Sequence, residues 1–287
     1  MAKRKAFLHV GLDDHSGNFL DAALERHQHA LAALGVRRPG ATEEMFRAAI
    51  EIRREHRAWG FRRAEVEGAW AQICRRGYKG NDTLVFSQPL LADSTPDQIA
   101  LLLDGLRGFK VHVLMTVAAP DTWTEPDLDL GALLDRWATA LGKTERLHVL
   151  VAPADRSRRT IWKAFGRVVG FGTASLPLDG VGKPAVPRPP RLVSTERYDA
   201  LRDLGRRWAC QLASRELDVH GDLSDLVPEA MEVPDPVTLV TSTDAALAEA
   251  LRTVDRLARR NDTLETRLVG LERKRRFKRG ADDPSVA

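Results

Sequence analysis

The chain has 287 residues, of which 43% are hydrophobic and 29% charged, and this composition indicates a globular protein and excludes global disorder. No apolar run approaches the roughly 18 to 20 residues of a membrane span, and the N-terminus is too poor in apolar residues for a signal peptide. Its two cysteines, Cys74 and Cys210, lie far apart in the sequence and predict neither a disulfide framework nor a metal site. We therefore expect a cytoplasmic protein without a membrane span.

The basic residues are concentrated near the C-terminus. The stretch RKRRFKR, residues 273–279, holds six basic residues, and the net charge falls from +4 to −2 when they are left out. The basic character therefore belongs to this stretch, and we do not expect the folded body to bind nucleic acid. We interpret the stretch as a solvated helix end, with an anion-binding patch as the alternative.

The stretch HVGLDDHSGNFLDAAL, residues 9–24, is typical of the end of a strand, a loop over 11–18 and the start of a helix. Such a unit can hold a phosphate on the free N–H groups of the helix start. This loop, however, carries Asp13 and Asp14 and no lysine or arginine. Carboxylates at this position favour capping of the helix over binding of an anion.

Strands and helices alternate after this unit. Further strands are predicted over 82–88, 110–117 and 146–153, and helices over 42–58, 61–77, 94–108, 130–142, 158–170 and 195–216. The strands are nearly continuous apolar runs, which indicates an α/β fold with a parallel sheet and helices on both faces. Ligand sites in such sheets lie beyond the C-terminal ends of the strands. The segments 11–18 and 118–123 both follow a predicted strand.

A heptad pattern begins at residue 244. Its a positions are Leu247, Val254, Asn261 and Leu268, and its d positions are Ala250, Leu257, Leu264 and Leu271. A single asparagine at an a position favours two parallel strands in register. We expect a parallel homodimer through residues 244–272, with a helix packed on its own domain as the alternative.

These patterns divide the chain into four parts. Residues 1–235 form the α/β domain, and residues 236–243 form a linker. We expect a coiled-coil helix with a basic end over 244–279 and a disordered tail over 280–287.

Several short sequence segments resemble the bacterial P-loop sulfotransferases, in particular actinobacterial members. They occur in the same order over about residues 5 to 230. They are FLHVGL with FLDAAL, LVFSQPLLA, VHVLMTV, LLDRWATALG with LHVLVAP, IWKAFGRVVG, and DVHGDLSDLVP. The resemblance implies a P-loop sulfotransferase-like fold. It also implies transfer of a sulfuryl group from 3′-phosphoadenosine 5′-phosphosulfate to a hydroxyl acceptor, which would be a small molecule or a glycan.

The positions that hold this cofactor in the family differ here. The first loop of the family reads like G-L-P-K-T-G-T-T, and an alignment without gaps places its Pro-Lys pair on Asp13 and Asp14. The remaining cofactor-binding candidates are His15, Ser16, Gly17 and Asn18. In the family an Arg-Asp pair binds the 3′ phosphate, and Ala118 and Ala119 occupy those positions here. A Ser-Glu motif of the family is replaced by Ser87 and Gln88.

Two interpretations follow for the function. In the first, which rests on the resemblance, we expect a sulfotransferase-like protein whose cofactor site is degraded, because the chain lacks the lysine and the arginine that hold the cofactor in the family. The alternative is a non-catalytic dimeric binding or scaffold protein built on the same fold. An arginine after the strand at 146–153 (Arg156, Arg158 or Arg159) would have to replace the missing cation in a working enzyme.

No metal site is predicted. His27 and His29 in HQH point about 200° apart on a helix and cannot share an ion. The adjacent residues Asp13, Asp14 and His15 have suitable donor atoms, but they have no evident distant partner. The catalytic residues are not identified by the sequence.

Overall fold

The structure is a computed structural model that describes residues 3–12, 14–121, 124, 127–181 and 195–228, with the backbone alone for 14–18. The predicted linker, coiled coil and tail therefore lie outside the described residues. The strands are β1 Lys5–Gly11, β2 Val36–Arg37, β3 Thr83–Ser87, β4 Lys110–Val117, β5 Leu147–Val151 and β6 Asp218–His220. The α-helices are α1 Asp14–Arg26, α2 Gln28–Ala33, α3 Thr42–Arg53, α4 Arg63–Val66, α5 Ala69–Tyr78, α6 Pro96–Gly105, α7 Leu130–Leu141, α8 Arg158–Val169 and α9 Thr195–Ala213. Short 3-10 helices are η1 Pro89–Leu91, η2 Thr144–Arg146 and η3 Leu223–Leu226.

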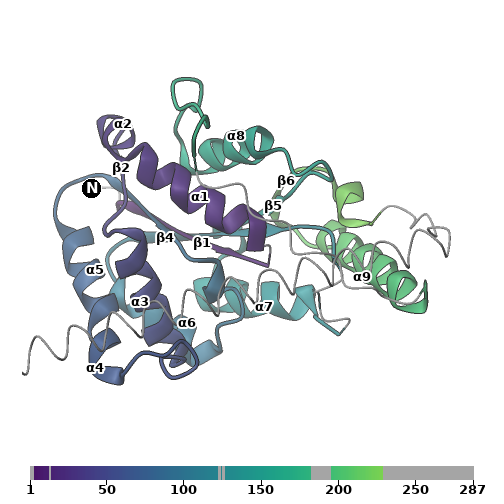
Figure 1. Cartoon of the computed structure of the whole chain (residues 1–287), viewed down its shortest axis with the longest axis horizontal. Coiled ribbons are helices and arrows are strands. Elements are labelled where there is room, and N and C mark those ends of the chain that lie inside the picture. The colour runs from purple at the N-terminus through teal and green to yellow at the C-terminus, as the bar shows by residue number, and fades with distance from the viewer. Residues whose placement is uncertain (1–2, 13, 122–123, 125–126, 182–194, 229–287) are drawn as a thin grey trace, which may run out of the picture. The chain divides into compact units, whose positions relative to one another are not determined.

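Within the described residues, the strands form one parallel sheet in the order β2-β3-β1-β4-β5-β6. Helices cover both of its faces (Figure 1), which confirms the predicted α/β architecture. The chain leaves the central strand β1 toward one edge of the sheet and later returns to β4 on the other side of β1. Such a reversal opens a crevice at the carboxyl ends of the strands, where ligands bind in open α/β sheets.

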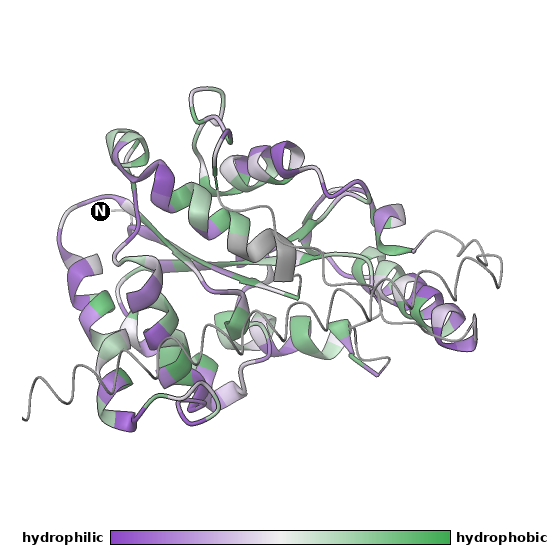
Figure 2. Cartoon of the chain, in the orientation of Figure 1, coloured by the Kyte–Doolittle hydropathy of each residue, from purple (hydrophilic) through white to green (hydrophobic). Residues whose placement is uncertain are grey.

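Each face of the sheet has its own apolar core. The helices α1, α2 and α8 pack on one face around Leu24, Trp162 and Phe165. The helices α3, α5, α6, α7 and α9 pack on the other face, where Trp137 and Trp208 are buried. The apolar sides of these helices face the strands, and their polar sides face outward (Figure 2). The alternation of buried strands and amphipathic helices in the sequence thus produces the three layers.

Local signals in the sequence set several helix ends. Thr95 caps α6 by accepting a hydrogen bond from the Gln98 amide, with Pro96 in the first turn. Helices α7 and α8 end at Gly142 and Gly170, whose left-handed φ angles of 65° and 100° suit glycine. These ends lie within a few residues of the predicted ones.

Two predicted helices are shorter than expected. The helix predicted over 61–77 is two helices, α4 and α5, because Gly68 adopts a left-handed φ of 82° between them. The helix predicted over 42–58 ends at Arg53, since Arg54 is left-handed at φ 59°. The edge strands β2 and β6 were not predicted.

The loop predicted over residues 11–18 is also shorter in the structure. Strand β1 continues to Gly11 and α1 begins at Asp14, which leaves two residues between them. A single glycine such as Gly17 costs a helix only about 1 kcal/mol. Burial of Phe19, Leu20 and Leu24 holds α1 on the sheet. A phosphate cradle has an extended glycine loop at this position, whereas here two residues separate the strand from the helix.

In the described part of the chain, no helix is both long enough and apolar enough to cross a lipid bilayer.

Candidate functional site

Gly11, at the end of β1, is required by the neighbouring strand. A Cβ atom at this position would lie 2.2 Å from Oγ1 of Thr116 on β4. The next residue, Leu12, donates its N–H to the Thr116 carbonyl oxygen at 3.0 Å. The glycine that begins the predicted phosphate loop thus allows close packing of two strands, which is a common reason for glycine inside a sheet.

His9 joins the three central strands just below this edge. Its Nδ1 lies 2.8 Å from the Ser87 hydroxyl on β3, and its Nε2 lies 3.2 Å from the Thr116 hydroxyl on β4. All three side chains are fully buried. Phe165 of α8 packs edge-on against the imidazole at 5.7 Å between ring centroids. The carboxyl edge of the sheet is therefore held in place by hydrogen bonds between side chains as well as by the backbone ladder.

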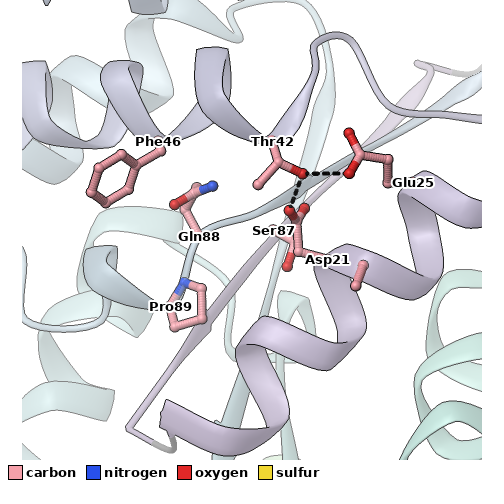
Figure 3. Close-up of a pocket in the computed structure, with 8 residues that line it drawn as sticks. Asp21, Glu25, Thr42, Phe46, Ser87, Gln88 and Pro89 are labelled. Carbon is pink, nitrogen blue, oxygen red and sulfur yellow. Dashed lines mark hydrogen bonds between the residues drawn. The ribbon is translucent and has the colours of Figure 1, made fainter. Parts of the chain in front are cut away.

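A cavity of about 200 Å³ opens between α1, α3 and the end of β3 (Figure 3). It lies at the β1–β3 side of the crevice that the strand order predicts. Its lining residues are Asp21, Ala22, Glu25, Thr42, Phe46, Ser87, Gln88 and Pro89. We call it the Gln88 pocket. Among these described lining residues there is no lysine or arginine.

A hydrogen-bonded network forms one wall of the Gln88 pocket. The Thr42 hydroxyl donates to Oδ2 of Asp21 at 2.6 Å, and Oε2 of Glu25 lies 3.2 Å from the same hydroxyl (Figure 3). Arg38 donates from Nη2 to Oδ1 of Asp21 at 2.6 Å and to the Thr42 hydroxyl at 3.0 Å. Its Nη1 lies 3.5 Å from Glu25 Oε1. The Arg38 guanidinium is therefore already paired with two carboxylates.

Burial raises the pKa of the Asp21 carboxyl above its ordinary value, although Arg38 and Thr42 act to lower it. Carboxyls with a raised pKa in a pocket are candidates for proton transfer. Asp21, however, directs both of its oxygens to Arg38 and Thr42. This bonding assigns Asp21 to the support of the pocket wall.

Gln88 offers an unused hydrogen-bonding group. It follows β3, and its backbone N–H donates to the His9 carbonyl oxygen at 2.9 Å. Its carboxamide faces the pocket (Figure 3), and no hydrogen bond joins this group to another described residue. Since a carboxamide both donates and accepts, it matches a hydroxyl group or another amide.

A second hollow of about 440 Å³ lies over the ends of β4 and β5. We call it the Arg156 hollow. It is lined by Ala118, Ala119, Ala152, Pro153, Ala154, Asp155, Arg156, Asp225, Val227 and Pro228. Arg156 has a left-handed φ of 51°, and its backbone N–H donates to the Pro153 carbonyl oxygen at 2.8 Å. One arginine and two aspartates therefore share this hollow.

The residues predicted for cofactor binding fall in different places. His15, Ser16, Gly17 and Asn18 lie in the first turns of α1, and their side chains are outside the described residues. Ser87 and Gln88 line one hollow, whereas Ala118 and Ala119 line the other.

The three arginines that follow β5 also differ in their positions. Arg156 lines the hollow, while Arg158 lies over the Phe19 ring at 5.6 Å and donates to the Val181 carbonyl oxygen at 3.3 Å. Arg159 is exposed on α8. Arg156 is thus the arginine of this group that shares a hollow with Ala118 and Ala119.

Sequence reasoning did not identify Asp21, Glu25 or Thr42. Asp21 and Glu25 are four residues apart and therefore lie on one face of α1. Asp21 is next to Leu20 and close to Leu24 in the apolar pattern, and a carboxylate at such a position is a signal of a buried partner. That Thr42 and Arg38 are the partners depends on how the helices pack.

The geometry defines a class of protein: a doubly wound parallel α/β protein with two hollows at the carboxyl edge of its sheet. Comparison with protein-family models, with curated proteins and with solved structures found no match for the chain.

Proposed function

We propose that the chain is a sulfotransferase-like protein whose donor site has diverged. In this proposal it binds a small neutral hydroxylated molecule, or one end of a glycan, in the Gln88 pocket. The observation that carries the proposal is the lining of that pocket: two carboxylates, two hydroxyls and one free carboxamide, without a lysine or arginine among its described lining residues.

Charge argues against a nucleotide donor in the Gln88 pocket. 3′-Phosphoadenosine 5′-phosphosulfate carries roughly four negative charges, and phosphate recognition relies on arginine and lysine. Asp21 and Glu25 would repel such a ligand, and Arg38 is already paired with both. Like charges that face each other in a site reduce the binding free energy by several kcal/mol.

Size and hydrogen bonding favour a small hydroxylated ligand. The volume of about 200 Å³ is below the roughly 300–1,000 Å³ of pockets for drug-sized ligands. The Gln88 carboxamide can donate to one hydroxyl oxygen and accept from another, and the Phe46 ring supplies an apolar surface beside it (Figure 3).

Titration calorimetry with 3′-phosphoadenosine 5′-phosphate at moderate salt tests the loss of the donor site. We expect no saturable heat in the micromolar range. Micromolar binding would contradict the proposal.

A second experiment tests the hydroxylated ligand. Saturation-transfer NMR with a panel of neutral disaccharides and sugar alcohols should give signals that weaken at least tenfold in Gln88→Ala. The control Gln72→Ala changes an exposed glutamine on α5 and should leave them unchanged. A panel without any signal, or equal signals in both variants, would count against the Gln88 pocket.

A working sulfotransferase is the second candidate, and one observation favours it. Arg156 lines the same hollow as Ala118 and Ala119, so that it can supply a cation from the next strand. In that case the calorimetric titration gives binding, and Arg156→Ala abolishes it. The scaffold alternative instead requires the dimer predicted from the heptads.

A further inference from the structure

Two neighbouring strands bring together three side chains of the types that ligate metals. These side chains do not line either hollow. Asp218 and His220 are two residues apart on the edge strand β6, so their side chains lie on the same side of the strand. His148 is the second residue of β5 and is paired directly with Asp218. None of the three lines the Gln88 pocket or the Arg156 hollow.

The donor atoms of these residues converge. Nδ1 of His148 lies 2.6 Å from Oδ2 of Asp218, and Nε2 of His220 lies 3.0 Å from the same oxygen. All three atoms lie within 4.8 Å of one another. We propose that His148, Asp218 and His220 form a binding site for a zinc-like divalent transition-metal ion.

The ligand set identifies the class of ion. Two imidazoles and one carboxylate suit zinc and related first-row metals, whereas calcium and magnesium prefer oxygen ligands alone. Zinc bonds of about 2.0–2.1 Å to nitrogen separate tetrahedral ligands by about 3.3 Å. The contacts of 2.6 and 3.0 Å would therefore open to about 3.3 Å around an ion, a small rearrangement of the side chains. Three protein ligands leave the fourth position for water or another ligand.

His112 on β4 supports this arrangement from behind. Its Nδ1 lies 2.9 Å from Nε2 of His148, the nitrogen that faces away from Asp218. The His112 ring stacks on Phe7 at 4.9 Å and on His148 at 5.2 Å between ring centroids. A hydrogen bond on the second ring nitrogen is the usual way in which proteins orient a metal-binding histidine.

Hydrogen bonding alone accounts for only part of the cluster. The bond between His148 and Asp218 satisfies both of those groups. Nε2 of His220, in contrast, is buried and has no partner in hydrogen-bond geometry among the described residues, despite its contact with Asp218. A buried nitrogen without a partner costs free energy, and an ion at the centre of the cluster would supply the missing bond.

An ion can reach this site from solvent. The Asp218 side chain is 48% exposed, whereas those of His148 and His220 are 11% and 18% exposed. The carboxylate is therefore the most accessible of the three ligands, and the two imidazoles are more buried.

The test uses the full chain, freed of metal with a chelator and then titrated with Zn²⁺ against a chromogenic competitor. We expect one equivalent to bind, at least tenfold more weakly in His220→Gln and in Asp218→Asn. The control His29→Gln removes an exposed histidine of α2 and should leave the affinity unchanged. Equal affinity in His220→Gln and wild type would overturn the site.

Co²⁺ binding to the unmodified chain provides a readout that does not depend on the variants folding. A protein site with nitrogen and oxygen ligands in tetrahedral geometry gives Co²⁺ an intense visible absorption, and displacement by Zn²⁺ should abolish it. If only the weak spectrum of hydrated Co²⁺ appears, the three side chains form a hydrogen-bonded cluster without an ion, and the proposal is wrong. Variant stability without metal is checked by thermal unfolding.

Discussion

Arg38 and Asp21 form an ion pair that is almost completely buried. The side chains are only 4% and 8% exposed, and Nη2 lies 2.6 Å from Oδ1. The pair connects the segment before α3 to the middle of α1 and forms the wall of the Gln88 pocket. Because both charges are taken out of water, removal of one partner leaves the other without compensation.

We therefore expect Asp21→Asn to lower the free energy of unfolding by about 3 kcal/mol. This value is at the lower end of the range for broken buried pairs, because Glu25 remains near Arg38 as a second carboxylate partner. The control is Glu43→Gln, which breaks a pair of the same 2.6 Å distance in which Arg47 and Glu43 are 42% and 74% exposed. That change should cost less than about 0.5 kcal/mol. Urea unfolding of both variants measures the difference, and equal losses would show that burial is not the cause.

The lowered pKa of Glu44 predicts that the free energy of unfolding decreases at acid pH. Hydrogen bonds from Arg76 and from the Ala41 amide lower the pKa of the Glu44 carboxyl from 4.5 to about 2. Since the pKa is lower in the folded chain, this stabilisation is complete above the unfolded pKa and is lost as the pH falls through the folded value. Solvent screening limits it to about 1 kcal/mol or less.

Glu44→Gln should thus flatten the fall in unfolding free energy between pH 4.5 and 2. Glu67→Gln, which removes the exposed 3.4 Å pair with Arg63, serves as the matched control. An identical pH profile for wild type and Glu44→Gln, measured by denaturant unfolding, would contradict the assignment.

Gly11→Ala tests the packing of β1 against β4. The added Cβ would meet the Thr116 hydroxyl, which is held in place by His9. We expect a loss of about 1–3 kcal/mol in stability, as for other overpacked cores. Gly172→Ala, at a position where nothing lies within 4 Å, should be nearly neutral.

The double variant Gly11→Ala with Thr116→Ala isolates this contact. Removal of the hydroxyl makes room for the new methyl group, so the two losses should not add. Fully additive losses in thermal or denaturant unfolding would show that the cost of Gly11→Ala arises elsewhere.

The heptads at residues 244–272 predict a dimer. Deletion of residues 244–287 should lower the molar mass measured by light scattering to that of a truncated monomer, because the a and d positions would be lost. Asn261→Leu keeps the apolar seam and should instead permit other oligomeric states. A truncated chain that remains dimeric would locate the interface in the α/β body.

The sequence was informative where structure is determined locally or by long runs. The strand predicted over 110–117 is β4 without change, since eight consecutive residues suit a buried strand. The strands β2 and β6 have two and three residues, and no periodicity can appear over so short a length. They are strands because β3 and β5 provide their hydrogen-bonding partners.

The same distinction holds for the site. Ala118 was expected at the carboxyl edge because it follows the strand predicted over 110–117, and Gln88 is the last residue of the strand predicted over 82–88; both lie at that edge in the structure. The wall formed by Asp21, Arg38 and Thr42 depends on the contact between α1 and the start of α3. That contact is tertiary, and no pattern within either segment specifies it.

The central position of β1 has a consequence for the order in which the protein is made. His9 bonds to residues 78 and 107 positions further along the chain, so β1 is synthesised before the strands β3 and β4 that pair with it. During that interval a growing chain exposes the apolar segment AFLHV, and unpaired strands of this kind invite aggregation. Lys3, Arg4 and Lys5 directly precede it. Clustered charges that flank an exposed strand oppose its association with other chains, and three adjacent cations beside β1 would act in this way on the nascent chain.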